Sequence, residues 1–198
     1  MNKKRMLKEQ KKNRATILWV GLIGIGLLLI SAAFMISNFK SGSSFAVSTL
    51  QSQYSTIPVK VNYPAPEINL TDINSNEVSL TQYSDEIILV NNWATWCPPC
   101  KAEMPTLLAY YEEHKGEDFV VIAIESGEAV DEVSEFAAKY GLTFPIWIDR
   151  KGAALDAFAN WSLPSSYVID KSGVVRLTWT GEISLEMLEK YVTPLLNN

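Results

Sequence analysis

Two cysteines lie three positions apart in this chain of 198 residues, Cys97 and Cys100, and the chain contains no others. A bridge this local closes too short a loop to hold a domain together, so the pair is not a structural scaffold. In the first turn of a helix, however, positions i and i+3 place two Cα atoms within the ~4.4–6.8 Å that a disulfide tolerates. The spacing therefore predicts a dithiol that opens and closes without movement of the backbone.

The dithiol is expected at the junction of a buried strand and a helix. Residues 87–90, Ile-Ile-Leu-Val, form the continuous apolar run of a strand buried on both faces, and a helix is predicted over residues 98–114. Unpaired amide groups and the positive end of the helix dipole favour a thiolate at Cys97. We therefore assign Cys97 as the attacking sulfur and Cys100 as the resolving one.

The chain after residue 62 alternates between strand and helix patterns. We predict a hairpin within residues 67–80, strands at 119–124 and 144–148, helices at 128–140 and 153–159, a second hairpin of 167–169 with 174–179, and a closing helix capped by Ser184. This order predicts an α/β fold, in which a mixed sheet is covered by helices on both faces.

A long apolar segment precedes this part of the chain. No charged residue lies between Arg14 and Lys40, and Ser31 is the only polar side chain of residues 17–36. At 1.5 Å per residue this run reaches ~30 Å, the thickness of a bilayer's hydrocarbon core. A cleavable signal peptide is the competing interpretation, but its apolar region is usually only ~7–15 residues long. We predict a basic leader over residues 1–15 and a transmembrane signal-anchor helix over 16–37.

Charge divides the chain at the same segment. The first forty residues carry eight basic side chains and one acidic one, a net charge of +7, and the remainder carries 9 basic and 21 acidic, a net charge of −12. The positive-inside bias keeps the leader in the cytoplasm, so the rest of the chain lies on the other side of the membrane. There we predict a flexible tether over residues 38–62 and a globular domain over residues 63–198. Because an acidic surface repels phosphate backbones, we exclude nucleic acid as a partner of the domain.

Several motifs surround the cysteines in a recognisable order. They are Pro64-Ala65-Pro66, residues 91–100 (NNWATWCPPC), residues 101–105 (KAEMP), residues 163–166 (LPSS) and residues 170–175 (DKSGVV). Over roughly residues 65–196 the sequence resembles the thioredoxin fold, and specifically the TlpA/ResA-like membrane-anchored thiol-disulfide oxidoreductases. The resemblance implies a bacterial domain that faces the outside of the cytoplasmic membrane and uses the Cys97–Cys100 disulfide without a further cofactor.

The resemblance also implies partners. Such proteins commonly reduce disulfides in client proteins, apocytochrome c before haem attachment among them, and a transmembrane thiol carrier of the CcdA type is the implied reductant. The residues alone leave the direction of electron flow open, so an oxidant or isomerase of the same fold is the alternative.

An acid near the dithiol is the third candidate for catalysis. Cytoplasmic thioredoxins place a buried Asp six residues before the first cysteine, where this chain has Asn91, which cannot take a proton. The TlpA/ResA-like pattern uses an acid just beyond the motif, and Glu103 stands there, three residues after Cys100 on the same helix face. We predict that Glu103 acts as a base toward Cys100, and the competing interpretation is a solvated helix residue.

Five residues are expected to contact a client. Pro98 and Pro99 lack amide hydrogens, so the Cys97 sulfur loses two potential hydrogen-bond donors. We therefore expect the Cys97–Cys100 disulfide couple to be relatively reducing. The resemblance implies a cis peptide bond before Pro164, which would set the backbone of Leu163 beside that sulfur for pairing with a client strand. Trp96 is predicted to act partly in packing and partly as the rim of the site.

Four other functions fit the residues less well. A copper chaperone of the Sco type uses CxxxC with a distant histidine, whereas the spacing here is CxxC and His114 lies on the same predicted helix. A structural zinc site needs four ligands and we count three at most, so we predict no metal-binding residues in the chain and assign His114 no function. The Pro-x-x-x-Thr-x-x-Cys signature of peroxiredoxins is missing, and an intact dithiol weighs against a non-catalytic binding module.

Overall fold

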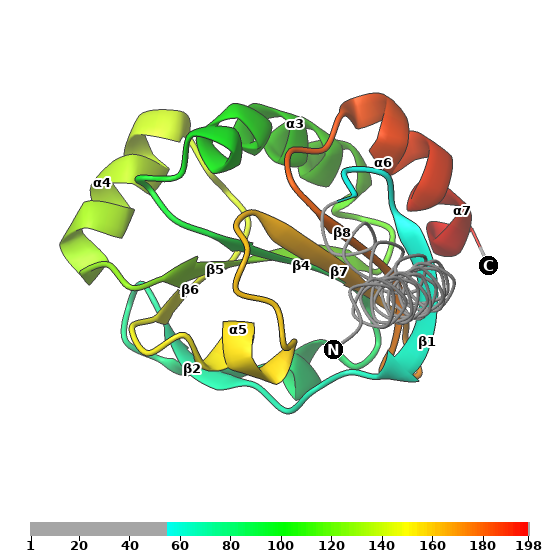
Figure 1. The fold of residues 1–198 in the computed structure, drawn as a ribbon, viewed down its shortest axis with the longest axis horizontal. Coiled ribbons are helices and arrows are strands. Elements are labelled where there is room, and N and C mark those ends of the chain that lie inside the picture. The colour runs from blue at the N-terminus through cyan, green and yellow to red at the C-terminus, as the bar shows by residue number, and fades with distance from the viewer. Residues whose placement is uncertain (1–54, 198) are drawn as a thin grey trace, which may run out of the picture. The chain divides into compact units, whose positions relative to one another are not determined.

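The computed structural model describes residues 55–197. These residues build an eight-stranded mixed sheet with the strand order β1-β8-β7-β4-β5-β6-β2-β3 (Figure 1). The strands are β1 Val59–Pro64, β2 Asn69–Asp72, β3 Glu77–Ser79, β4 Ile87–Trp93, β5 Phe119–Ser126, β6 Ile146–Asp149, β7 Ser165–Ile169 and β8 Val174–Thr180. Both predicted hairpins are present, since β2 pairs antiparallel with β3, and β7 with β8.

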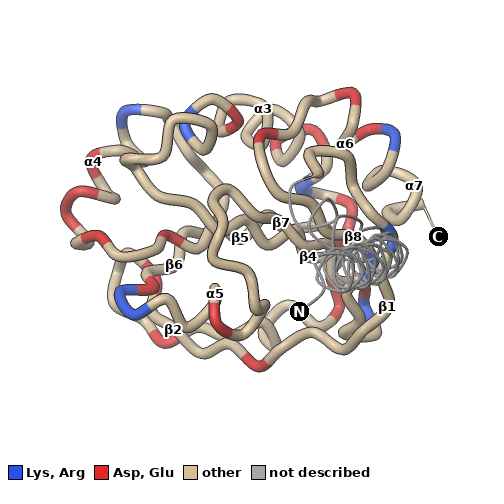
Figure 2. The backbone as a smooth tube through the Cα atoms, viewed as in Figure 1, with Lys and Arg blue, Asp and Glu red and all other residues tan. Residues whose placement is uncertain are grey.

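Strand β4 lies inside the sheet, parallel to β5 and antiparallel to β7. All of its residues are buried, as predicted for residues 87–90, and the strand continues to Trp93. Its side chains enter two separate apolar clusters, Leu89 in one and Ile88 with Val90 in the other, because successive side chains of a strand point to opposite faces. The sheet therefore has an apolar core on each face. Charged residues lie mainly on helices and loops, and β4 carries none (Figure 2).

Helices cover both cores (Figure 1). They are α3 Pro98–His114, α4 Val130–Tyr140, α5 Ala153–Ala157, α6 Leu185–Tyr191 and α7 Thr193–Leu196, with a 3₁₀ turn η1 at Leu80–Tyr83. Helices α3, α4 and α6 pack on one face through Leu107, Phe136 and Leu188. Helix α5 and turn η1 pack on the other face through Ala154 and Leu80. The predicted α/β class and mixed sheet, with helices on both faces, are confirmed.

Single residues end or begin the helices as the sequence predicts. Gly141 follows α4 in the left-handed conformation with φ 65°, which glycine adopts without the steric cost of a Cβ atom. The Ser184 hydroxyl accepts a hydrogen bond from the Met187 amide in the first turn of α6. This bond satisfies one of the amide groups that a helix N-terminus leaves without a partner.

The predicted tether is wrong at its C-terminal end. Residues 59–62 belong to strand β1, which pairs antiparallel with β8 and places Val59 opposite Thr178. Its residues do alternate, with Val59, Val61 and Tyr63 apolar and Lys60 and Asn62 polar, but the run is short and mostly exposed, and its pairing with β8 holds it in place.

The other predictions for the N-terminal part concern the leader at 1–15, the span at 16–37 and the first part of the tether, and they lie outside the described residues. Within residues 55–197, none of the helices combines the length and the apolar character needed to cross a membrane.

Candidate active site

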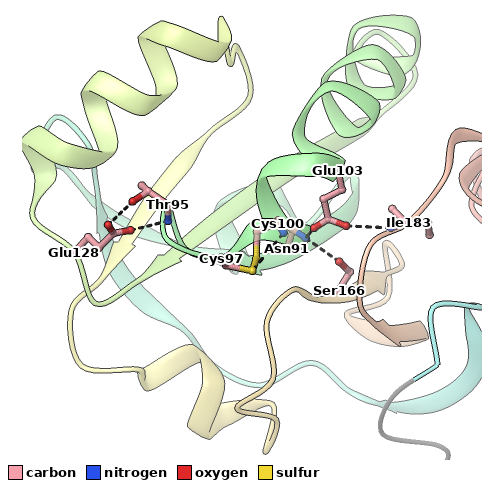
Figure 3. The surroundings of a disulfide bond; sticks show 8 residues. All are labelled: Asn91, Thr95, Cys97, Cys100, Glu103, Glu128, Ser166 and Ile183. Carbon is pink, nitrogen blue, oxygen red and sulfur yellow. Dashed lines mark hydrogen bonds between the residues drawn. A yellow bond between two sulfur atoms is a disulfide. The ribbon is translucent and has the colours of Figure 1, made fainter.

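The two cysteines form a disulfide where β4 gives way to α3 (Figure 3). Cys97 is the N-cap residue of α3 and Cys100 lies in its first turn. Their Cα atoms are 5.3 Å apart, which agrees with the distance predicted from the spacing. The Cys97 sulfur accepts a hydrogen bond from the Cys100 amide at 3.3 Å. A backbone donor therefore already points at the sulfur that carries negative charge once the disulfide is reduced.

Exposed apolar side chains flank the disulfide. Trp96 is 64% exposed, and Pro98 and Pro99 are exposed as well. Of the two sulfur-bearing residues, Cys97 is 3% exposed and Cys100 is completely buried. The accessible side of the disulfide is therefore that of Cys97, next to Trp96 and the two prolines.

The peptide bond between Leu163 and Pro164 is cis, as the resemblance implied. Pro164 is buried and precedes β7, and its carbonyl accepts a hydrogen bond from the Gly181 amide at 2.8 Å. Leu163 is partly buried against the apolar cluster that contains Cys97 and Cys100. The structure thus brings this loop and the dithiol, more than sixty residues apart in the chain, to the same core.

Glu103 is completely buried on α3, one turn after Cys100 (Figure 3). One carboxylate oxygen accepts a hydrogen bond from the Asn91 amide group at 2.8 Å, and the other accepts one from the Ile183 amide at 3.2 Å. Burial raises the pKa of Glu103 to about 8, because the desolvation of the charge outweighs both hydrogen bonds. The interpretation of Glu103 as a solvated helix residue is therefore wrong.

Asn91 connects three elements at this point. Its side-chain nitrogen donates to Glu103 on α3 and to the Ser166 hydroxyl on β7, the latter at 3.0 Å. Its side-chain oxygen is buried and has no hydrogen-bond partner among the described residues. Rotation of the amide by half a turn would present this oxygen to the proton of a neutral Glu103. Asn91 can therefore satisfy Glu103 in either protonation state.

A pair of carboxylates that the sequence did not reveal, Glu125 and Glu128, supports the loop before Cys97. Glu128 accepts hydrogen bonds from the Thr95 amide at 2.7 Å and from the Thr95 hydroxyl (Figure 3). The Glu128 amide in turn donates to both carboxylate oxygens of Glu125, each at 3.2 Å.

Glu125 supports this arrangement from the end of β5. It is completely buried, and burial, reinforced by the neighbouring Glu128, raises its pKa to about 8. The only signal in the sequence is a pair of acids, Glu125 and Glu128, directly after an apolar strand. Their link to Thr95 spans 33 residues and cannot be read from local spacing.

Comparisons with known proteins agree with this geometry. The family model described as AhpC/TSA matches residues 61–178. The thiol-disulfide oxidoreductase ResA of Geobacillus kaustophilus is 37% identical over 68% of this chain and 77% of its own length. The protein of the same name from Oceanobacillus iheyensis is 28% identical over 94% of this chain and 93% of its own.

Solved structures share the fold. A thiol:disulfide interchange protein of the thioredoxin family from Chlorobium tepidum superposes with a TM-score of 0.62 at 24% identity, and the match covers 70% of this chain and 99% of that one. StoA from Bacillus subtilis gives a TM-score of 0.56 at 23% identity over 65% of this chain and 97% of its own. The chain therefore belongs to the AhpC/TSA family and, within the thioredoxin fold, to the ResA-like thiol-disulfide oxidoreductases.

Proposed function

We propose that this thiol-disulfide oxidoreductase works as a reductase of client proteins, with Cys97 as the attacking and Cys100 as the resolving sulfur. The observation that carries the assignment is the position of Cys97 at the N-cap of α3, beneath the exposed Trp96-Pro98-Pro99 surface, while Cys100 is completely buried. A nucleophile must reach its target, whereas a resolving thiol needs to reach only its neighbour.

The reaction has two exchange steps. The Cys97 thiolate attacks one sulfur of the client disulfide, which forms a mixed disulfide and releases the second client sulfur as a thiolate. Cys100 then loses its proton and attacks the Cys97 sulfur, which releases the first client thiolate. Two electrons pass to the client, and the enzyme is left with the Cys97–Cys100 disulfide.

Glu103 is our candidate for the base in the second step. A group with a pKa of about 8 lies close to the ~8.5 of an ordinary thiol, so a proton moves between them with little change in free energy. Glu103 also sits one helical turn from Cys100 in a site closed to water. These two properties suit proton acceptance from a buried thiol.

The proline pair supports the reducing direction. Pro98 and Pro99 occupy the first two positions of α3, where a helix normally offers free amide donors. The Cys100 amide is thus the first of the helix that can bond the Cys97 sulfur. A thiolate with fewer donors is less stabilised, and a less stabilised thiolate makes the dithiol a stronger reductant. An oxidant or isomerase of the same fold is the competing function.

Client binding is assigned to the surface around the disulfide. Trp96, Pro98 and Pro99 form its exposed part. The backbone at Leu163 and Pro164 would pair with an extended client segment, because backbone hydrogen bonds recognise a strand without regard to its sequence. Such a surface suits unfolded clients with disulfides, apocytochrome c among them.

We assign the anchor from the sequence. Residues 1–15 would form the cytoplasmic leader and residues 16–37 the helix in the bilayer, with the oxidoreductase domain on the outer side of the cytoplasmic membrane and a CcdA-type membrane carrier as its reductant. The apolar run at 17–36 supports this topology. Protease added to intact spheroplasts should remove the domain and spare the leader, and a protected domain would contradict the orientation.

Reduction of insulin in the presence of dithiothreitol tests the activity. The full chain should accelerate precipitation of the insulin B chain, and Cys97→Ser should not. The reduction potential of the couple then decides the direction. We expect a value nearer the ~−270 mV of thioredoxin than the ~−120 mV of a strong oxidant, and a value above about −180 mV would favour the oxidant or isomerase.

A further inference from the structure

A cluster of possible metal ligands lies at the far end of α3 from the disulfide. The ligand atoms of Glu113, His114 and Glu189 all lie within 4.8 Å of one another. Glu113 and His114 end α3, and Glu189 belongs to α6. Fourteen helix positions separate His114 from Cys100, a rise of about 21 Å. The cluster is therefore separate from the redox site.

The histidine of this cluster has an unusual environment. His114 is only 7% exposed, and its Nδ1 atom lies 3.0 Å from a carboxylate oxygen of Glu117. Nε2 is buried without a hydrogen-bond partner among the described residues, and it lies 3.8 Å from a carboxylate oxygen of Glu189. If Nδ1 donates its hydrogen to Glu117, a neutral ring turns the lone pair of Nε2 toward a second carboxylate. That contact is repulsive unless a cation lies between the two groups.

The surroundings match those of metal sites in proteins. A metal-binding histidine commonly donates its other ring N–H to a carboxylate, which fixes the tautomer, and Glu117 is placed to accept that bond. The carboxylate of Glu189 is itself held by the Thr193 hydroxyl at 2.8 Å. Thr193 is in turn bonded to the Tyr110 hydroxyl at 2.9 Å. The negative end of the α3 dipole adds to the attraction for a cation.

We propose that His114 Nε2 and the carboxylates of Glu113 and Glu189 bind a divalent transition metal, for which Zn²⁺ is the best match. Imidazole and carboxylate are both common zinc ligands, and water would complete a four-coordinate site. The ion would join the end of α3 to α6. Because it binds the folded chain, it would stabilise the fold by an amount that grows with the logarithm of its concentration relative to its dissociation constant.

Zinc titration of the full chain tests the site. The protein is used without a histidine tag, because His114 is its only histidine, and with the disulfide closed, so that neither cysteine binds zinc. Calorimetry should show one equivalent of bound Zn²⁺. His114→Gln and Glu189→Gln should each weaken binding about tenfold or more, by analogy with the ~10–100-fold cost of disturbing a metal ligand's support. Glu186→Gln on the same helix is the matched control and should bind as the wild type does.

Thermal unfolding provides the second readout. Zinc should raise the unfolding temperature of the wild type and of Glu186→Gln, and leave that of the two ligand variants unchanged. Glu189 is partly exposed, so Glu189→Gln keeps the test valid even if His114→Gln does not fold. Equal zinc binding by wild type and both ligand variants would overturn the proposal. An unfolding temperature that zinc does not move would also overturn it.

Discussion

Asn91 on β4 donates a hydrogen bond of 2.8 Å to Glu103 on α3, and neither side chain is exposed to solvent. This bond favours the charged form of Glu103, whereas burial favours the neutral form and raises its pKa to about 8. An uncharged residue at position 91 therefore influences the pKa of an acid on the neighbouring helix.

Replacement of Glu103 by Gln should slow turnover most in the resolving step. The variant keeps nearly the same shape but removes the base, and general-base catalysis is typically worth ~10²–10⁴-fold. The defect should shrink at high pH, where hydroxide removes the Cys100 proton. Stopped-flow tryptophan fluorescence follows the step. If the variant matches wild type from about pH 6 to 9, Glu103 has no role in proton transfer.

Replacement of Asn91 by Ala should move the pH profile of the resolving step to higher pH. The hydrogen bond from Asn91 lowers the pKa of Glu103, so its loss raises that pKa further and the carboxylate form appears only at higher pH. Asn92→Ala is the matched control, because Asn92 is equally buried but donates to Ser165 instead. An unchanged profile in Asn91→Ala, or the same shift in Asn92→Ala, would refute the tuning role.

Replacement of Cys100 by Ser should trap clients as covalent adducts. Without the resolving thiol, the mixed disulfide at Cys97 has no internal nucleophile that can break it. Non-reducing gels of membranes from cells that express the variant should show bands that disappear with dithiothreitol. The reverse pattern, with adducts in Cys97→Ser and none in Cys100→Ser, would exchange the two roles.

Replacement of Glu128 by Gln should loosen the loop before Cys97. The change removes the charge from two hydrogen bonds to Thr95, and bonds to charged groups contribute about 1.5–3 kcal/mol each. We expect the free energy of unfolding in urea to fall by about 1–3 kcal/mol, and the reduced protein to react more slowly with a disulfide reagent. Glu135→Gln, at an exposed position of α4, should change neither quantity.

The free energy of unfolding should fall as pH rises from about 4.5 to 8. Glu103 and Glu125 both have a pKa raised from 4.5 to about 8, so in this range the folded chain keeps protons that the unfolded chain releases, and higher pH favours unfolding. Asp170, whose pKa is lowered to about 2, acts in the opposite direction but only at more acidic pH. Urea unfolding at a series of pH values measures this dependence. For Glu103→Gln the free energy of unfolding should fall less steeply with pH than for wild type, and an equally steep fall would contradict the raised pKa of Glu103.

Features that depend on neighbours along the chain could be predicted from the sequence. The spacing of Cys97 and Cys100 implied their disulfide, since the distance between positions i and i+3 is set by helix geometry alone. The apolar run at residues 87–90 implied a buried strand, and Pro98, Gly141 and Ser184 marked helix ends because their backbone or hydrogen-bonding preferences are local. Strand β1 was missed although Val59, Val61 and Tyr63 alternate with polar residues, because so short a run next to a Ser/Thr/Gln-rich segment is a weak signal until its pairing with β8 is seen.

The electrostatic environment of the site was decided by the tertiary structure. The sequence placed Glu103 near Cys100, but its burial and its pKa depend on Asn91 and on Ile183, which lie 12 and 80 residues away in the chain. The contacts of Glu128 with Thr95, and of His114 with Glu189, likewise join separate elements. Desolvation and hydrogen bonding depend on which residues the fold brings together, and no local periodicity specifies those partners.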